Sequence, residues 1–264
     1  MSEKTMAFFS VGKGKTELYE LARKSNGSQE IVVYEAHELF GQTGRFRVLQ
    51  FGDNAVQGAI DLRDPDRIVL EYPREIVRLI RKRTPENGII FMIGHGIGTI
   101  AGHFREDQCL VAEVNADIVE LSRSYFQYGW NNVEIGDGRA LLEQQADGSF
   151  DYVILDAFTR EGTPHHLKTE EFFAMARQKL KAGGMLIMNA AGRLQRDPVL
   201  NAIHTTMEQV FASVRAFALT EGERDAERNV LFLGSETPAT EEVNGLEGFI
   251  QVQPEQGYIL RDRV

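Results

Sequence analysis

The stretch IIFMIGHGIGTIAGHF, residues 89–104, decides the fold, because a long apolar run ends in evenly spaced glycines. The glycines are Gly94, Gly96 and Gly98. The apolar run predicts a buried strand, and the residues from about Thr99 predict a helix that follows it. Glycines at the carboxyl end of such a strand let the backbone approach a nucleotide-like ligand, and N–H groups at a helix start can donate to it. The spacing also fits a dinucleotide motif, so the loop alone leaves NAD and adenosyl ligands open.

From residue 73 onward, apolar strand-like runs alternate with helical patterns, which is typical of a wound α/β sheet. The expected strands are GIIFMIG, CLVAEV, NVEIG, FDYVILDAF, GGMLIMNA, VRAFALT and RNVLFLGS. Thr169, and Asp197 followed by Pro198, mark helix starts by their capping chemistry. A short polar loop joins the last two strands, so they should form an antiparallel hairpin. This pattern predicts a Rossmann-like class I methyltransferase fold, with a seven-stranded sheet and a late antiparallel hairpin.

The residues before this region have a different texture. Short runs between residues 30 and 70 are rich in β-branched and aromatic residues and are separated by glycines. We therefore expect a small N-terminal antiparallel β-unit over residues 1–72. The Rossmann-like domain should cover residues 73–235, and residues 236–264 should form a C-terminal tail.

Composition limits the classes of function. A net charge of −10 and a pI near 5.2 argue against nucleic-acid binding, which needs a basic face. Cys109 is the only cysteine, so a disulfide within the chain and a cysteine-based zinc site are excluded, and the histidines show no metal-ligand spacing. The first residues lack the apolar core of a signal peptide, and no segment approaches the roughly 20 apolar residues of a membrane span. We expect a soluble, cytoplasmic protein without a metal.

Acidic residues end three successive expected strands. Glu113 follows CLVA, Asp137 follows NVEIG, and Asp156 ends FDYVILD. A carboxylate at the second strand end can accept from ribose hydroxyls, and one at the third can accept from an adenine amino group. Three acids beside a glycine loop favour an adenosyl ligand derived from methionine over a dinucleotide.

These motifs resemble those of the spermidine synthases over about residues 30–235. The resemblance rests on EYPREIV at 71–77, the glycine loop, AEVNADIVELSRSYF at 112–126, GDGR at 136–139 and the aspartate after the fourth strand. It implies a small β-sheet followed by a Rossmann-like transferase domain, and a dimer or tetramer, of which we expect a homodimer. It also implies that Glu113 holds ribose, that Asp137 and Gly138 hold adenine, and that the glycine loop lines the methionine part of the ligand.

Two positions depart from the family pattern. The family loop G-G-G-D-G-G carries an aspartate that faces the amino end of decarboxylated S-adenosylmethionine, and this chain has Ile97 there. A carboxylate at that place would repel the carboxylate of ordinary S-adenosylmethionine, so its loss removes a barrier to that ligand. The family motif D-S-S-D-P is reduced to Asp156-Ala-Phe-Thr159-Arg160, which keeps the proton acceptor and loses the second, polyamine-holding aspartate.

The candidate site residues follow from these motifs. We expect Asp156 to accept a proton from the substrate, and Tyr72 matches a tyrosine of the family's active-site entrance, although Asp156 could simply cap its loop and Tyr72 could be a core aromatic. The expected cofactor-binding residues are Gly94, His95, Gly96, Ile97, Gly98, Glu113, Val114, Asp137, Gly138 and Asp156. The expected substrate-binding residues are Tyr72, Phe158, Thr159 and His165. His165 and His166 lie in a loop that could cover the site or simply be an exposed loop.

Three functional hypotheses remain open at this point. The first is methyl transfer from S-adenosylmethionine to a small amine or other nucleophile, in which the protein aligns the reactants and Asp156 takes the proton. The second is aminopropyl transfer from decarboxylated S-adenosylmethionine. The third is a pseudoenzyme that binds an adenosyl ligand, which the changes at Ile97 and Thr159 favour and the retention of three acids disfavours.

Overall fold

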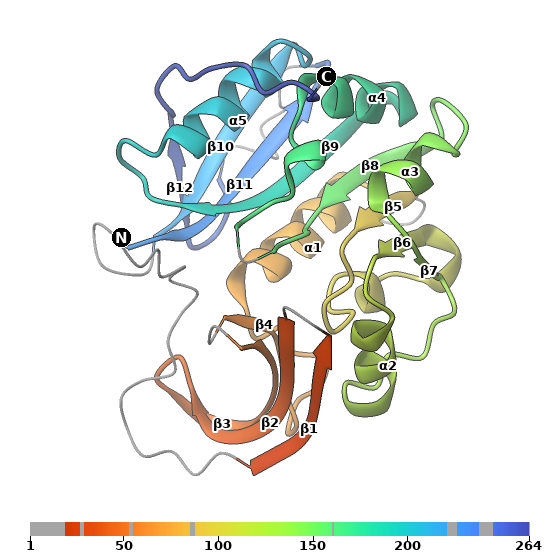
Figure 1. The fold of residues 1–264 in the computed structure, drawn as a ribbon, viewed down its shortest axis with the longest axis vertical. Helices are drawn as coiled ribbons and strands as arrows, with labels where there is room; N and C mark the ends of the chain where they lie inside the picture. The colour runs from red at the N-terminus through yellow and green to blue at the C-terminus, as the bar shows by residue number, and fades with distance from the viewer. Residues whose placement is uncertain are drawn as a thin grey trace.

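The computed structural model of the chain describes residues 19–26, 29–52, 55–84, 88–159, 161–220, 226–237 and 245–263. These residues build a small sheet and a larger α/β layer, which lie one below the other in Figure 1. The predicted fold is confirmed by this arrangement. The first residues and Arg160, for which the sequence made predictions, lie outside the described residues.

The N-terminal sheet has four antiparallel strands in sequence order. They are β1 (Tyr19–Asn26), β2 (Gln29–Leu39), β3 (Gln42–Phe51) and β4 (Val56–Asp61). The sequence predicts the last three, whereas β1 lies before the segment in which strands were expected. In β3 the buried Phe46 lies between the more exposed Arg45 and Arg47, as expected for a strand with one face on a core, whereas Val48 and Leu49 are both buried.

The main sheet has the order β12-β10-β11-β9-β8-β5-β6-β7 among the described residues. Its strands are β5 (Ile90–Ile93), β6 (Cys109–Glu113), β7 (Val133–Ile135), β8 (Phe150–Leu155), β9 (Leu180–Gly192), β10 (Ser213–Leu219), β11 (Arg228–Ser235) and β12 (Phe249–Val252). Strands β5 to β9 are parallel, and β11, β10 and β12 are added antiparallel.

All seven predicted strands and the hairpin of β10 and β11 are present. The eighth strand, β12, comes from the segment predicted as a tail and pairs with β10. The main sheet therefore extends beyond residue 235, the end expected for the domain from the sequence. Strand β5 lies between β6 and β8, so the chain leaves these central strands in opposite directions and opens a crevice at their carboxyl ends.

Helices cover both faces of the main sheet (Figure 1). Helix α1 (Glu71–Arg83) packs on one face through Ile76 and Ile80, which contact core residues of β5, β8 and β9. Helices α3 (Gly138–Glu143), α4 (Glu170–Lys179) and α5 (Pro198–Glu208) pack on the other. Helix α2 (Ala116–Tyr125) joins the two sheets, because its Ile118 and Leu121 pack with residues of β2 and β3. This helix therefore fixes the small sheet beside the crevice.

Local signals place the helix starts correctly, with one exception. The Thr169 hydroxyl accepts from Phe172 N–H, and the Asp197 carboxylate accepts from the N–H groups of the first turn of α5. The helix expected from Thr99 is wrong: the chain there forms turns and a short 3-10 helix, η1 (Ala101–His103). The helical turn ends at Phe104, whose φ of −118° and ψ of 164° are extended, and η2 (Glu106–Gln108) follows only two residues after η1.

Candidate functional site

A cavity of about 350 Å³ lies at the carboxyl ends of β5, β6 and β8, on the side where the small sheet approaches. It brings together eleven of the residues predicted from the sequence: Tyr72, Gly94, His95, Gly96, Glu113, Val114, Asp137, Gly138, Asp156, Phe158 and Thr159. Its volume is in the range of pockets that hold small molecules and cofactors. The predicted strand-end residues therefore do share one enclosed space.

The glycine loop is shaped by contacts that only glycine allows. Gly94 has φ +96°, and a Cβ built on it would lie 2.1 Å from the Asp156 backbone oxygen. The loop after β5 thus passes directly against the strand end of β8, which carries the candidate base. Gly98 instead faces the ring of Tyr128, 2.2 Å from its Cβ position, and does not line the cavity.

Ile97 is also directed away from the cavity and is buried, with 7% of its surface exposed. It packs with apolar residues of β2, β3 and α2, and a Cβ on Gly58 of β4 would lie 2.7 Å from its side chain. It lines two other spaces, one of about 870 Å³ that does not include Asp156, and one of about 20 Å³ that also contacts Gln57, Tyr72 and Asp156. Ile97 therefore anchors the small sheet behind the loop and adjoins the cavity only through the smaller of these spaces.

Glu113 is held by backbone donors at the end of β6. Its two carboxylate oxygens accept hydrogen bonds from the N–H groups of His95, at 2.9 Å, and Asn115, at 2.9 Å. Only 6% of its surface is exposed, and burial raises its pKa although the backbone N–H bonds oppose that rise. The remaining lone pairs of this fixed carboxylate can accept from neighbouring hydroxyl groups. Val114 beside it is 75% exposed and forms an apolar rim.

Asp137 caps helix α3 and also lines the cavity. As the N-cap of α3 it accepts from Ala140 N–H at 3.0 Å, and its second oxygen lies 2.7 Å from His166 Nε2. Burial acts to raise the pKa of this carboxyl, but the Ala140 N–H and His166 outweigh it, and the pKa is lowered. Asp137 is therefore an ionised acceptor at this end of the cavity, and His166, rather than the predicted His165, faces it.

Asp156 lies at the centre of the cavity wall and is bound from two sides. The Tyr72 hydroxyl donates to Oδ2 at 3.2 Å, and the Asn189 amide donates to Oδ1 at 2.9 Å. The Asn229 side-chain amide in turn donates to Asn189 Oδ1 at 3.0 Å, which fixes the orientation of the Asn189 side chain. The carboxyl is thus pre-oriented by side chains from α1, β9 and β11.

The protonation states around Asp156 suit proton transfer near neutral pH. Burial raises the pKa of Asp156 to about 6, while the bonds from Asn189 and Tyr72 act in the opposite direction. Burial and the neighbouring Asp156 charge raise the pKa of Tyr72 well above its usual value, so the phenol stays protonated and donates. A carboxylate with a pKa near the working pH is an effective general base.

His95 forms part of the wall as a neutral ring. The Ser122 hydroxyl donates to Val119 O at 2.8 Å, so His95 Nε2 is the donor in its own 2.8 Å contact with that hydroxyl. Burial lowers the pKa of His95 to about 4, with Arg123 adding to the effect. Its Nδ1 finds no hydrogen-bond partner within the described part of the chain. His95 therefore brings no charge to the cavity.

Two predicted substrate-binding residues, of which Thr159 lines the cavity, use their polar groups in hydrogen bonds within the protein. The Thr159 hydroxyl donates to Gly162 O at 2.9 Å and closes a tight loop, so its proton is used within its own segment. His165 Nε2 donates to Arg261 O at 2.9 Å and does not line the cavity. These side chains hold the rim of the site in place.

Sequence reasoning missed several residues of the site. The small sheet contributes Phe51 and Gln57 to the cavity wall, and β9 contributes Asn189, whose side-chain amide donates to the Asp156 carboxylate. His166 was noted as a possible cover and turns out to contact Asp137. Only the amide in the strand GGMLIMNA gave a signal, as a polar residue in an otherwise apolar run.

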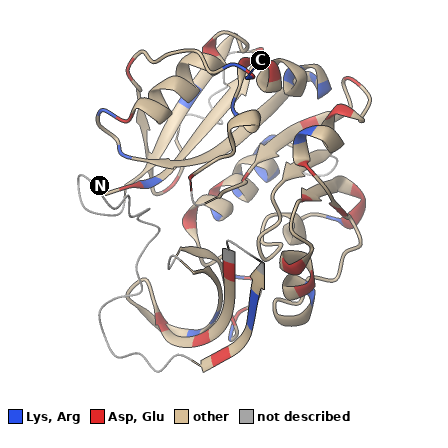
Figure 2. Ribbon diagram, viewed as in Figure 1, with Lys and Arg blue, Asp and Glu red and all other residues tan. Residues whose placement is uncertain are grey.

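Among the described residues, no group of three or more His, Cys, Asp or Glu side chains could hold a metal ion. In the same part of the chain, no helix combines the length and apolarity that a membrane crossing needs. Figure 2 shows Lys and Arg interspersed with Asp and Glu over both sheets.

Comparisons with known proteins point in one direction. The family model described as the spermine/spermidine synthase domain matches residues 69–221. A polyamine aminopropyltransferase of Vibrio vulnificus is 28% identical over 175 residues, which cover 61% of this chain and 56% of that protein. The chain spans between 56% and 61% of the lengths of this and two similar curated relatives.

Solved structures share the fold. A probable spermidine synthase from Corynebacterium glutamicum aligns with a TM-score of 0.75 at 20% identity, covering 92% of this chain and 96% of that one. Human methyltransferase-like protein 13 in complex with SAH aligns with a TM-score of 0.52 at 17% identity, covering 66% and 88%. The small sheet followed by a Rossmann-like domain is thus an architecture found in solved proteins.

Proposed function

Since the chain belongs to the spermine/spermidine synthase family, we propose that it is a transferase that moves a group from an adenosyl sulfonium ligand to a nucleophile. The observation that carries the proposal is Asp156, a half-buried carboxyl fixed by Tyr72 and Asn189 in the wall of the cavity. A nucleophilic amine must lose a proton when it forms its new bond, and this carboxylate would accept it.

The residues of the cavity fit an adenosyl ligand. Glu113 offers a fixed, buried acceptor for the ribose hydroxyls, and Asp137 offers an ionised acceptor for the adenine amino group. Gly94 would place the methionine side of the ligand against Asp156, because its missing side chain leaves the two strand ends in contact. When bound, such a ligand supplies an electrophilic carbon on sulfur. The protein would contribute alignment and the proton acceptor.

The finer proposal is methyl transfer from S-adenosylmethionine to a small amine or other nucleophile. Two small spaces of about 20 and 50 Å³ adjoin Tyr72 and are lined largely by aliphatic, aromatic and amide side chains. Glu71 is the one carboxylate among the described residues that line them. If the nucleophile binds in these spaces, their size and composition suit a small amine better than a polycation, which needs several carboxylates.

Aminopropyl transfer is the second candidate, because the named relatives are polyamine aminopropyltransferases and spermidine synthases. It would use decarboxylated S-adenosylmethionine and the same base. A small-molecule acceptor, a homodimer and a cytoplasmic location remain predictions under either reading.

The leaving product separates the two reactions. Methyl transfer releases S-adenosylhomocysteine, whereas aminopropyl transfer releases methylthioadenosine. The protein should be incubated with each donor and a panel of small amines, and the products identified by mass spectrometry. Formation of S-adenosylhomocysteine by the wild type, and not by an Asp156→Asn control, supports methyl transfer. Methylthioadenosine formed only from the decarboxylated donor would instead support aminopropyl transfer. Binding without turnover of either donor would leave the pseudoenzyme hypothesis.

A further inference from the structure

The last described residues form a strap, residues 255–262, that crosses α5 and α4 after β12 (Figure 1). Its backbone N–H groups are bound by side chains of α5: Glu255 N–H donates to Asn201 at 3.0 Å, Gly257 N–H to Thr205 at 2.8 Å, and Leu260 N–H to Thr206 at 2.9 Å. These bonds set the strap in one register along the helix.

Two contacts show how closely the strap is fitted. A Cβ on Gly257 would lie 2.5 Å from the backbone of Asn201 and Ala202 in α5, so any larger residue must lift the strap. Leu260 is 7% exposed and belongs to the core on this face, and its carbonyl accepts from the first N–H of α4 at 2.8 Å. The strap is therefore part of the folded domain.

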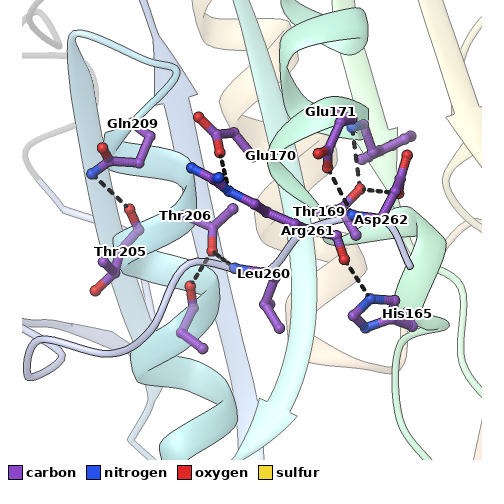
Figure 3. Close-up of polar contacts among 12 residues, drawn as sticks. His165, Thr169, Glu170, Glu171, Thr205, Thr206, Gln209, Leu260, Arg261 and Asp262 are labelled. Atoms are coloured by element: carbon purple, nitrogen blue, oxygen red, sulfur yellow. Dashed lines mark hydrogen bonds and ion pairs between the residues drawn. The ribbon is translucent and has the colours of Figure 1, made fainter. Parts of the chain in front are cut away.

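The far end of the strap is tied to α3 and α4, as Figure 3 shows in part for Arg261, Asp262 and their partners in α4. Asp262 forms two hydrogen bonds with the Arg139 guanidinium, at 2.8 and 2.6 Å, and accepts from the Thr169 hydroxyl at 2.8 Å. The bond to Arg139, more than any other contact, lowers the pKa of Asp262 to about 2. Arg261 pairs with Glu170 at the exposed surface.

The same residues also hold the segment Pro164–Leu167, which lines the cavity through Pro164, His166 and Leu167. Arg139 donates to His166 O at 3.0 Å, and His165 donates to Arg261 O at 2.9 Å. His166 then reaches Asp137 at 2.7 Å. A continuous chain of contacts thus runs from the strap to the carboxylate expected to bind adenine.

We propose that the C-terminal strap is a positioning element for the adenine end of the adenosyl site, acting through Asp262 and Arg139 on the segment Pro164–Leu167. Without the strap, this segment would lose its bond to Arg261 O, and Arg139, which binds His166 O, would lose the carboxylate that orients it. The inference rests on the proposed function for the identity of the ligand, but the ordering of Pro164–Leu167 by the strap does not depend on it.

The alternative is a strap that only stabilises the fold by covering the core at Leu260. Both roles predict lower stability on its removal, so stability cannot separate them. The proposal alone predicts that a substitution of Asp262, whose side chain is not part of the apolar core around Leu260, changes affinity for the adenosyl ligand at temperatures where the protein is fully folded.

The test compares three variants of the full chain. Asp262→Ala breaks the tie to Arg139, and Gly257→Ala lifts the strap from α5. Arg261→Ala is the matched control, because it removes a neighbouring ion pair to Glu170 while leaving the backbone carbonyl that binds His165. Calorimetry with methylthioadenosine gives the dissociation constant, and hydrogen exchange of the ligand-free proteins reports on residues 164–168.

Asp262→Ala and Gly257→Ala should raise the dissociation constant about 3- to 10-fold, as expected if the competent arrangement becomes a minority population. They should also speed exchange at residues 164–168, with kcat on saturating donor unchanged, whereas Arg261→Ala should match the wild type. Wild-type affinity and exchange in both strap variants would overturn the inference. If the wild type binds no adenosyl ligand, the proposed function fails, and the exchange data still decide whether the strap orders the segment.

Discussion

Replacement of Asp156 by Asn should make the protein more stable while removing its activity. Burial raises the pKa of Asp156 from its usual 3.8 to about 6, so the folded protein must hold a poorly solvated charge at neutral pH. A shift of about two pKa units corresponds to roughly 3 kcal/mol. Asp156 is half-buried and lines the cavity, so we expect a somewhat smaller gain, about 2–3 kcal/mol in the free energy of unfolding for Asp156→Asn at pH 8.

The sign follows from proton linkage. The unfolded chain releases this proton near pH 4 and the folded protein near pH 6, so wild-type stability falls across that interval and the penalty is constant above it. The asparagine carries no charge, and its amide can still bond with Tyr72 and Asn189. The advantage of the variant should therefore be full at pH 8 and nearly absent at pH 4.

Urea unfolding of both proteins at pH 8 and pH 4 measures this difference, with an expected midpoint shift of about 1 M at pH 8. Asp64→Asn, at an exposed carboxyl, is the control and should show no such gain. Transfer activity of Asp156→Asn should fall about 10²- to 10⁴-fold, as for loss of a general base. Equal stability at pH 8, or a gain that persists at pH 4, would refute the reasoning.

Three further predictions follow from the same contacts. Tyr72→Phe removes one of the two hydrogen bonds that oppose the raised pKa of Asp156. The acid limb of the pH–rate profile, expected near pH 6, should therefore move up by as much as about one pH unit. Initial rates from pH 5 to 9 measure this shift, and an unmoved limb would exclude an effect of Tyr72 on the pKa of Asp156. Glu113→Gln places an amide NH₂ against one of the backbone N–H groups that bind the carboxylate in the wild type. It should weaken methylthioadenosine binding about 10-fold in calorimetry. Glu134→Gln, at an exposed carboxyl, is the control and should leave binding unchanged. Burial raises the pKa of the Cys109 thiol to about 12, so a disulfide reagent at pH 8 should label it only after denaturation, and rapid labelling of the folded protein would contradict this burial.

Much of the fold was predictable because its signals are local. Apolar runs such as 89–93 mark the central strands, and capping residues such as Thr169 mark helix starts whatever lies around them. The helix expected after the glycine loop ends after one turn, because the backbone becomes extended at Phe104, and the residue types there give no signal of that change. Strand β12 was missed because its four residues show no alternating pattern. They form a strand by pairing with the edge of β10, which only the folded structure makes available.

The candidate site was predictable where topology alone brings residues together. The carboxyl ends of parallel strands meet at one edge, so Glu113 and Asp156 had to be neighbours of the glycine loop. Gln57 and Asn189 reach the site through packing of distant segments, which no spacing in the sequence reveals. The direction of Ile97, toward the small sheet, likewise depends on a space opened by Gly58.

The central claim is that the cavity between Glu113 and Asp156 holds an adenosyl ligand. Calorimetric titration of the wild-type protein with S-adenosylmethionine, its decarboxylated form and methylthioadenosine tests it most directly. We predict one site per chain for each ligand, with the carboxylated donor preferred over the decarboxylated one. Binding of none of the three would contradict the claim, and a strong preference for the decarboxylated donor would contradict the proposal of methyl transfer.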